Sequence, residues 1–296
     1  MRVGICQVDG EWPNLALAKL AAHHRAHGDR VEHFMPLADY DRVYASKVFA
    51  DTPDDLYLPP DTIRGGTGYS LTSVLPYEVE ATRPDFSLWP RWDKSMGFTT
   101  RGCVRRCPFC VVPRKEGGIR VVAQFGDVWD GRSSEVILLD NNVTAAPLGH
   151  FRSVLADAKR NDVTLDFSQG FDARLWTDEH MAAVVECWPF RRRVHFAFDN
   201  VRDETAVRRV VSMWKASGLH PDRLVFYVLI GFDSTPEQDM YRVELLRSLG
   251  VNPFVMKFKR TDPYQTRFAR WVNNKVAFKA MSWPEWCGTF KTTVPS

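Results

Sequence analysis

The chain has 296 residues, of which 45% are hydrophobic and 25% charged, with a formal net charge of +3. This composition is typical of a folded globular protein and excludes a disordered, fibrous or strongly basic chain. The longest apolar runs, such as 224–232, are much shorter than the roughly 20 residues that span a bilayer. Residues 1–14 lack the apolar stretch of a signal peptide. We therefore expect a cytoplasmic protein with no membrane segment, in which thiols stay reduced.

Residues 1–92 alternate between strand and helix patterns. We expect one helix, at 14–28, with Gly28 as its C-cap, and strands at 1–8, 29–36 and 41–49. Residues 61–70 are expected to form a short strand that runs into a glycine loop. Short strands and helices in this order favour a parallel, Rossmann-like sheet. Residues 80–96 lose periodicity and contain two prolines, so the linker to the next domain is placed there.

Residues 93–290 show a longer and more regular alternation. Strands are predicted at 97–102, 135–142, 164–171, 192–200, 223–232 and 251–258, and helices at 148–160, 177–187, 203–217, 236–249 and 264–280. Repeated strand–helix units of similar size predict a (β/α)6 partial TIM barrel, so the fold class is α/β in both domains. In such barrels the chemistry lies on loops at the carboxyl ends of the strands.

Three of the six cysteines, Cys103, Cys107 and Cys110, form a C-x3-C-x2-C motif just after the first predicted barrel strand. Three thiolates on an irregular loop can converge on one soft metal centre. A four-iron cluster held this way keeps one iron open, whereas a structural zinc site needs a fourth ligand, such as Cys187, Cys287 or a histidine. The paired C-x2-C knuckles of zinc sites are absent. The spacing therefore favours an iron–sulfur cluster over zinc and over chance burial of thiols.

The stretch "TTRGCVRRCPFCVVPRKEGG" (99–118) resembles the cluster loop of radical S-adenosylmethionine (radical SAM) enzymes, with Phe109 as the aromatic residue before the last cysteine. The segment "LVFYVLIGFDSTPEQD" (224–239) resembles the fifth-strand region of that family. Over about residues 1 to 285 the chain resembles short family members of unassigned substrate. Those members carry an N-terminal Rossmann region similar to a cobalamin-binding domain.

The resemblance implies a [4Fe–4S] cluster in which Cys103, Cys107 and Cys110 are the metal ligands and form the catalytic centre. S-adenosylmethionine would bind the open iron, and its reductive cleavage would yield a 5′-deoxyadenosyl radical that abstracts hydrogen from an unidentified substrate. A low-potential electron donor such as flavodoxin or ferredoxin is implied as well. The side chains expected to contact the cofactor are Phe109, Asp140, Asn142, Gln169, Arg174, Asp199 and Ile230.

Four of these contacts have a specific expected role. The backbone around Phe109 would meet the adenine and Ile230 would form an apolar wall beside it. Arg174 suits a carboxylate, because its guanidinium binds in bidentate geometry, and Asp199 would hold the ribose hydroxyls. For the polar residues at strand ends, a capping or loop hydrogen bond is the alternative role.

The sequence departs from the family pattern in two places. Where the cobalamin domain carries Asp-x-His-x-x-Gly, this chain has "QVDGEWPN" without histidine, so we predict that cobalamin does not bind. The Gly-Gly-Glu segment after the second strand, which contacts the methionyl amino group in the family, is replaced by "LLDNNVTAAP" (138–147).

A group of cations surrounds the cysteine motif: Arg101, Arg105, Arg106, Arg114, Lys115 and Arg120. They could attract an anionic substrate, such as a nucleotide or nucleic acid, or balance the charge of a thiolate-held cluster. The competing functional class is a zinc-stabilised nucleic-acid-binding protein without catalysis, which would use the same cysteines and arginines.

Overall fold

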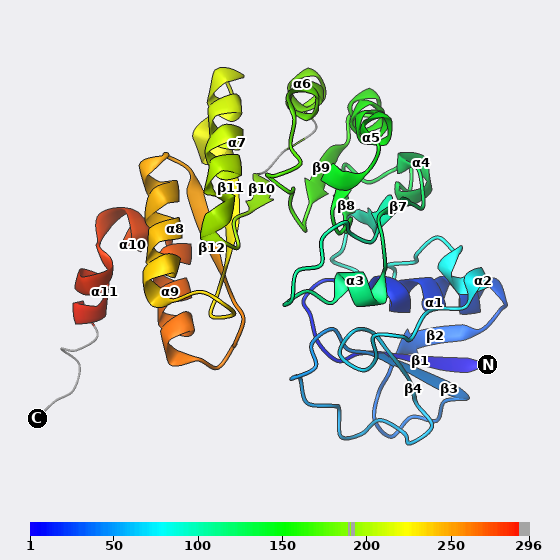
Figure 1. Cartoon of the computed structure of the whole chain (residues 1–296). Coiled ribbons are helices and arrows are strands. Elements are labelled where there is room, and N and C mark those ends of the chain that lie inside the picture. The colour runs from blue at the N-terminus through cyan, green and yellow to red at the C-terminus, as the bar shows by residue number, and fades with distance from the viewer. Residues whose placement is uncertain (189, 191–192, 290–296) are drawn as a thin grey trace, which may run out of the picture.

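A computed structural model describes residues 1–188, 190 and 193–289 of the chain. It is a mixed α/β structure with parallel sheets, which confirms the predicted fold class at that level. Figure 1 shows an N-terminal sheet unit beside a larger unit in which helices cover the strands on one side. In this part of the chain, none of the helices combines the length and apolarity that a membrane span requires.

The N-terminal unit is a four-stranded parallel sheet with one long helix. Its strand order is β2-β1-β3-β4, and its elements are β1 (Arg2–Gln7), α1 (Leu15–Ala26), β2 (Arg30–His33), β3 (Arg42–Ser46), β4 (Ile63–Gly65) and α2 (Tyr77–Glu80). Asn14 caps α1 by accepting a hydrogen bond from the Leu17 N–H, and Gly28 follows the helix with a φ of 81°. Both ends therefore match the predicted helix, because the capping chemistry is local in sequence.

The predicted linker holds no helix or strand between α2 and residue 95, yet it packs on the N-terminal unit. Asp85 forms an ion pair with Arg25, and the rings of Trp92 and Trp12 lie 5.8 Å apart. The linker is therefore an ordered segment that packs along the N-terminal unit. The domain boundary placed at residue 92 stays a prediction.

The larger unit contains two three-stranded parallel sheets, ordered β5-β8-β9 and β10-β11-β12. A single parallel bridge between Phe171 and Phe196 joins them in the described residues. The strands are β5 (Ser95–Gly97), β8 (Glu135–Leu138), β9 (Thr164–Phe167), β10 (Val194–Ala197), β11 (Leu224–Ile230) and β12 (Asn252–Lys257). The helices that follow them are α4 (Phe125–Val128), α5 (Leu148–Arg160), α6 (Asp178–Cys187), α7 (Glu204–Ala216), α8 (Pro236–Ser248) and α9 (Pro263–Asn273). Helices α10 (Lys275–Ala280) and α11 (Trp283–Thr289) complete the described chain.

The two faces of these strands differ in their surroundings. In β11, Phe226, Val228 and Ile230 are fully buried in the core that the helices share, whereas Tyr227 and Leu229 on the opposite face are only half-buried. The same alternation in β10 exposes His195 more than Phe196. One face of the sheet therefore packs on helices, and the other remains open toward the cysteine loop.

Two predicted elements differ in the structure. The first strand, expected at 97–102, ends at Gly97, because Asp140 accepts hydrogen bonds from the N–H groups of Thr99 and Thr100 two and three residues later. The chain then forms β6 (Thr100–Arg101), which pairs antiparallel with β7 (Arg120–Val121). The helix expected at 264–280 is broken at Asn274, whose side chain caps the new helix α10.

The remaining predicted elements agree with the observed ones to within a few residues. Of the strand predicted at 192–200, Arg192 lies outside the described residues, as does residue 290 at the end of the predicted second domain.

Candidate functional site

The three cysteines lie on the loop between β6 and helix α3 (Val112–Lys115). The two ends of this loop are tied together, since the Cys103 N–H donates to the Gly117 carbonyl at 3.1 Å. Gly102 has a φ of 84°, and a Cβ at this position would collide with the Gly118 carbonyl. The loop therefore needs glycine directly before its first cysteine.

The three thiols are free and half-buried. Burial raises the pKa of Cys107, with Cys110, Asp199 and Cys103 adding to the rise and Arg174 opposing it. Burial raises the pKa of Cys110 too, opposed by a hydrogen bond from the Val112 N–H. Cys107 and Cys110 therefore both lie within electrostatic range of Cys103 and Asp199. As the side chains stand, no three His, Cys, Asp or Glu residues of the described chain form a set that could hold a metal ion.

Asp140 is buried and anchors the chain that leads into the cysteine loop. Its carboxylate accepts hydrogen bonds from the Thr99 N–H at 2.6 Å, the Thr99 hydroxyl at 2.5 Å and the Thr100 N–H at 3.0 Å. Burial raises the pKa of Asp140, and these hydrogen bonds oppose the rise. Both oxygens are engaged within the protein, so the observed role of Asp140 is structural.

Asn142 places a carboxamide beside the first cysteine. Its Nδ2 lies 3.4 Å from the Cys103 Sγ, to which it donates a hydrogen bond. Its Oδ1 is buried and has no hydrogen-bond partner within the described residues. A buried acceptor without a donor is costly, so this oxygen is suited to a ligand that brings an N–H or O–H group.

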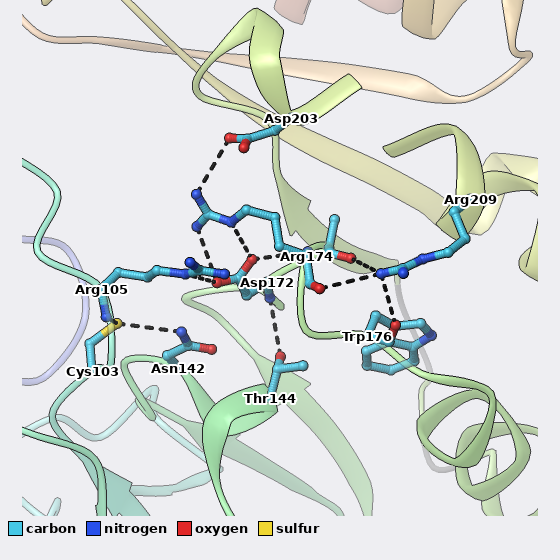
Figure 2. Close-up of polar contacts among 10 residues, drawn as sticks. Cys103, Arg105, Asn142, Thr144, Asp172, Arg174, Trp176, Asp203 and Arg209 are labelled. Atoms are coloured by element: carbon cyan, nitrogen blue, oxygen red, sulfur yellow. Dashed lines mark hydrogen bonds and ion pairs between the residues drawn. The ribbon is translucent and has the colours of Figure 1, made fainter. Parts of the chain in front are cut away.

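Asp172 connects the cysteine loop to the end of the third strand, as Figure 2 shows. Its carboxylate binds the Arg105 Nε at 3.0 Å and the Arg174 Nε at 2.7 Å, and its own N–H donates to the Thr144 hydroxyl at 3.1 Å. Burial would raise the pKa of Asp172, but the two arginines outweigh it and hold the pKa below its ordinary value. Asp172 thus fixes the segment between Cys103 and Cys107 through Arg105.

Arg174 was expected to be available for a ligand carboxylate, but it is engaged within the protein. Besides Asp172 it contacts the Asp203 carboxylate at 3.4 Å, and these acids raise its pKa against the opposing effect of burial. Arg209 donates to the carbonyls of Ala173, Arg174 and Trp176 and so fixes the backbone that carries this arginine (Figure 2). An Asp-x-Arg pair at a strand end was the sequence signal for this ion pair.

Of the other residues expected to contact the cofactor, some lie near the thiols and some do not. The Phe109 ring packs edge-on against Phe232 at 5.5 Å, and the Asp199 Oδ1 accepts a hydrogen bond from the Leu229 N–H at 3.2 Å. Burial raises the pKa of Asp199. Gln169 is exposed, and Ile230 is buried in the core on the helix-covered face. The structure thus groups Asn142, Arg174 and Asp199 with the three thiols, but not Gln169 or Ile230.

Most of the cations around the cysteine loop already have partners. Arg101 binds Glu116 at 3.0 Å and Glu80 at 2.9 Å, and Glu80 also binds Lys19 of α1 at 2.9 Å. This network links both ends of the cysteine loop to the N-terminal unit and borders a cavity of about 1330 Å³. Sequence patterns did not reveal Glu80, because it acts across the domain boundary.

Further contacts join the N-terminal unit to the larger unit, and two of them lie near strand ends. The Lys115 Nζ donates to the Thr67 hydroxyl at 2.8 Å, and burial lowers the pKa of this lysine. The Arg260 guanidinium, which follows β12, lies over the Phe49 ring at 3.7 Å. Thr67 and Phe49 both follow strand ends, so the carboxyl edge of the N-terminal sheet faces the cysteine loop.

No family model matches this chain, and a search of curated proteins finds no match either. Among solved structures, it is similar to Streptococcus suis SuiB bound to S-adenosylmethionine, with a TM-score of 0.44 and 10% identity over 63% of this chain and 47% of that one. SuiB bound to the precursor peptide SuiA gives a TM-score of 0.45 and 12% identity over 63% and 46%. SuiB alone gives 0.44 and 9% over 64% and 48%. The chain therefore spans about half the length of these SuiB structures.

Proposed function

We propose that this chain is a radical SAM enzyme whose cluster is held by Cys103, Cys107 and Cys110. The observation that carries the proposal is the C-x3-C-x2-C loop itself, which follows the first strand of a parallel sheet and carries three half-buried thiols. When bound with S-adenosylmethionine and reduced, the cluster would supply a carbon radical able to take hydrogen from a substrate.

The strand order supports a (β/α)6 partial barrel at 93–290. The Phe171–Phe196 bridge joins β5-β8-β9 to β10-β11-β12, so six parallel strands follow one another in chain order. The parallel sheet of residues 1–65 supports a separate Rossmann-like domain at 1–92. The cysteine loop then follows the first barrel strand, where such folds carry their chemistry.

The residues around the thiols fit a thiolate-held cluster. Thiols with a raised pKa are protonated at neutral pH, so iron binding would have to release their protons. The pKa of Cys107 is raised by burial, and Arg174 opposes this rise. Arg105 and Arg174 are both fixed by Asp172, so the segment between Cys103 and Cys107 is held in place.

We further propose that the unpartnered Asn142 Oδ1 accepts a hydrogen bond from the ammonium group of S-adenosylmethionine. Asn142 stands in the segment that replaces Gly-Gly-Glu, and its position beside Cys103 supports this role. Asp199, which lies near Cys107 and Cys110, is the candidate for the ribose hydroxyls.

Replacing Asn142 with alanine is expected to weaken S-adenosylmethionine binding about tenfold, because a buried hydrogen bond to a charged donor is lost. Equilibrium dialysis on the reconstituted protein measures this affinity, and iron content is measured in parallel. The matched control is Asn161→Ala, which removes a carboxamide at the exposed end of α5 and should leave the affinity unchanged. Equal affinities for wild type and Asn142→Ala would disprove the assignment.

The proposed function is tested by anaerobic reconstitution with iron and sulfide, reduction with dithionite, and assay for 5′-deoxyadenosine after addition of S-adenosylmethionine. We expect about four iron and four sulfide per chain together with the product. One zinc per chain without sulfide would instead support the zinc-stabilised binding protein. A cluster that forms without any product would contradict the radical chemistry.

A further inference from the structure

Strand β12 and the residue directly after it present three large apolar side chains on the open face of the sheet. Phe254, Met256 and Phe258 are exposed by 44%, 46% and 44%, while Val255 between them is buried on the helix-covered face. Single exposed apolar residues are common, but an alternating row on one strand forms a continuous apolar surface. We call these three residues the β12 row.

The β12 row continues sideways into a stack of aromatic rings. The His195 and Tyr227 rings are parallel, with centroids 4.8 Å apart and planes inclined by 2°, and Phe254 meets Tyr227 edge-on at 5.8 Å. The Tyr227 hydroxyl donates to the Ser168 carbonyl at 3.1 Å, which fixes the ring. The result is a wall of rings on the face that opens toward the cysteine loop.

This wall carries little charge at neutral pH. Burial, with Arg193 adding to it, lowers the pKa of His195 to about 4, so the imidazole is neutral. Burial raises the pKa of Tyr227 to about 12, and the negative charge of Asp166 adds to the rise. Both rings of the stack are therefore uncharged at neutral pH.

The row is continuous with the proposed radical site. Phe258 packs against Phe232 with centroids 4.9 Å apart, and Phe232 packs against Phe109 in the cysteine loop at 5.5 Å. A molecule on the β12 row would therefore lie on the same apolar surface as the cysteine loop. Meanwhile Arg101 and Arg105 of that loop are occupied by acidic partners.

Near the β12 row, the outer edge of β12 has few free backbone groups with which a peptide strand could pair. Pro253 has no N–H to donate, and the Asn273 side chain binds both the Val255 N–H at 2.7 Å and the Val255 carbonyl at 3.0 Å. An extended peptide would find few backbone partners here. Binding to the β12 row would therefore depend on contacts made by an aromatic ring of the bound molecule.

We infer that the substrate is a free small molecule with an uncharged aromatic ring, and that the ring packs on Met256, Phe254 and Tyr227 beside the cysteine loop. The inference rests on the proposed function, because it takes the cysteine loop as the site of the reaction. It replaces the expected anionic substrate with an apolar one.

The test uses saturation-transfer NMR on the reconstituted holoprotein, with 4-methylphenol as the aromatic probe. Uridine monophosphate serves as the anionic probe and the peptide Gly-Phe-Gly as the peptide probe. We expect 4-methylphenol to bind, and Met256→Gln to weaken its binding about tenfold. The matched control is Met35→Gln, because Met35 is 54% exposed on the N-terminal unit and should not affect binding.

Three results would overturn the inference. Binding of uridine monophosphate that exceeds that of 4-methylphenol would restore the anionic substrate. Much tighter binding of Gly-Phe-Gly would indicate a peptide substrate. An equal loss of S-adenosylmethionine affinity in Met256→Gln would assign the β12 row to the adenosine. Because binding is measured without turnover, a failure of radical chemistry appears separately, as absence of 5′-deoxyadenosine.

Discussion

Replacing Cys107 with alanine is expected to abolish both cluster assembly and 5′-deoxyadenosine formation. Cys107 is the middle thiol of the loop, and its pKa responds to both Cys103 and Cys110. Two remaining thiolates cannot hold a four-iron centre with one open iron. Iron and sulfide analysis, the visible spectrum and product assay on the reconstituted variant measure the loss, which should exceed 100-fold in product.

The matched control is Cys187→Ala. Cys187 is also half-buried, but it ends α6 and packs against the helix-covered core. This variant should keep wild-type iron and product. Loss of iron in both variants would show that stability, and not ligation, governs the result, whereas retained iron in Cys107→Ala would refute the ligand assignment.

Replacing Asp172 with asparagine is expected to lower the free energy of unfolding by about 2 kcal/mol, because two partly buried arginines lose their shared carboxylate. The figure is moderated by solvent, since the Arg105 and Arg174 side chains are 34% and 29% exposed. Urea-induced unfolding measures the change. Because Arg105 lies between Cys103 and Cys107, we expect a lower iron content as well.

The Asp172 effect should depend on pH. The folded pKa of Asp172 lies below its ordinary value of 3.8, so its stabilising contribution is complete above about pH 5 and is lost as the pH falls through the folded pKa. The difference between wild type and Asp172→Asn should therefore shrink below about pH 4. Asp157→Asn, which breaks only a surface pair with Arg160, should change stability by less than about 0.5 kcal/mol at any pH. A constant difference down to pH 2 would contradict the ion-pair explanation.

Local signals in the sequence predicted the helices well. The helix expected at 148–160 is confirmed as α5, and the one opening at Pro236 is confirmed as α8, because capping and apolar spacing lie within a few residues. The end of the first barrel strand depends on Asp140, about 40 residues away, and no local pattern reveals that contact.

In the candidate site too, local motifs could be predicted from the sequence, whereas long-range contacts could not. The cysteine motif and the strand-end residues could be identified from spacing, but their partners could not. Arg174 was expected to face a ligand, yet Asp172 and Asp203 engage it. Likewise Gln169 shares a strand end with Asp172 but is exposed. Which way a side chain turns at a strand end depends on neighbours far away in the chain.

Two of the contacts made by the N-terminal unit reach different sheets of the larger unit. Thr67 binds Lys115 beside β5-β8-β9, and Phe49 meets Arg260 beside β10-β11-β12, while the described residues join these sheets by one bridge. The sheets also share one core, in which Phe171, Trp176 and Phe196 pack against one another. The N-terminal unit therefore adds a second link between the two sheets, outside that core. A fragment beginning at residue 93 would lose this second link and keep only the shared core.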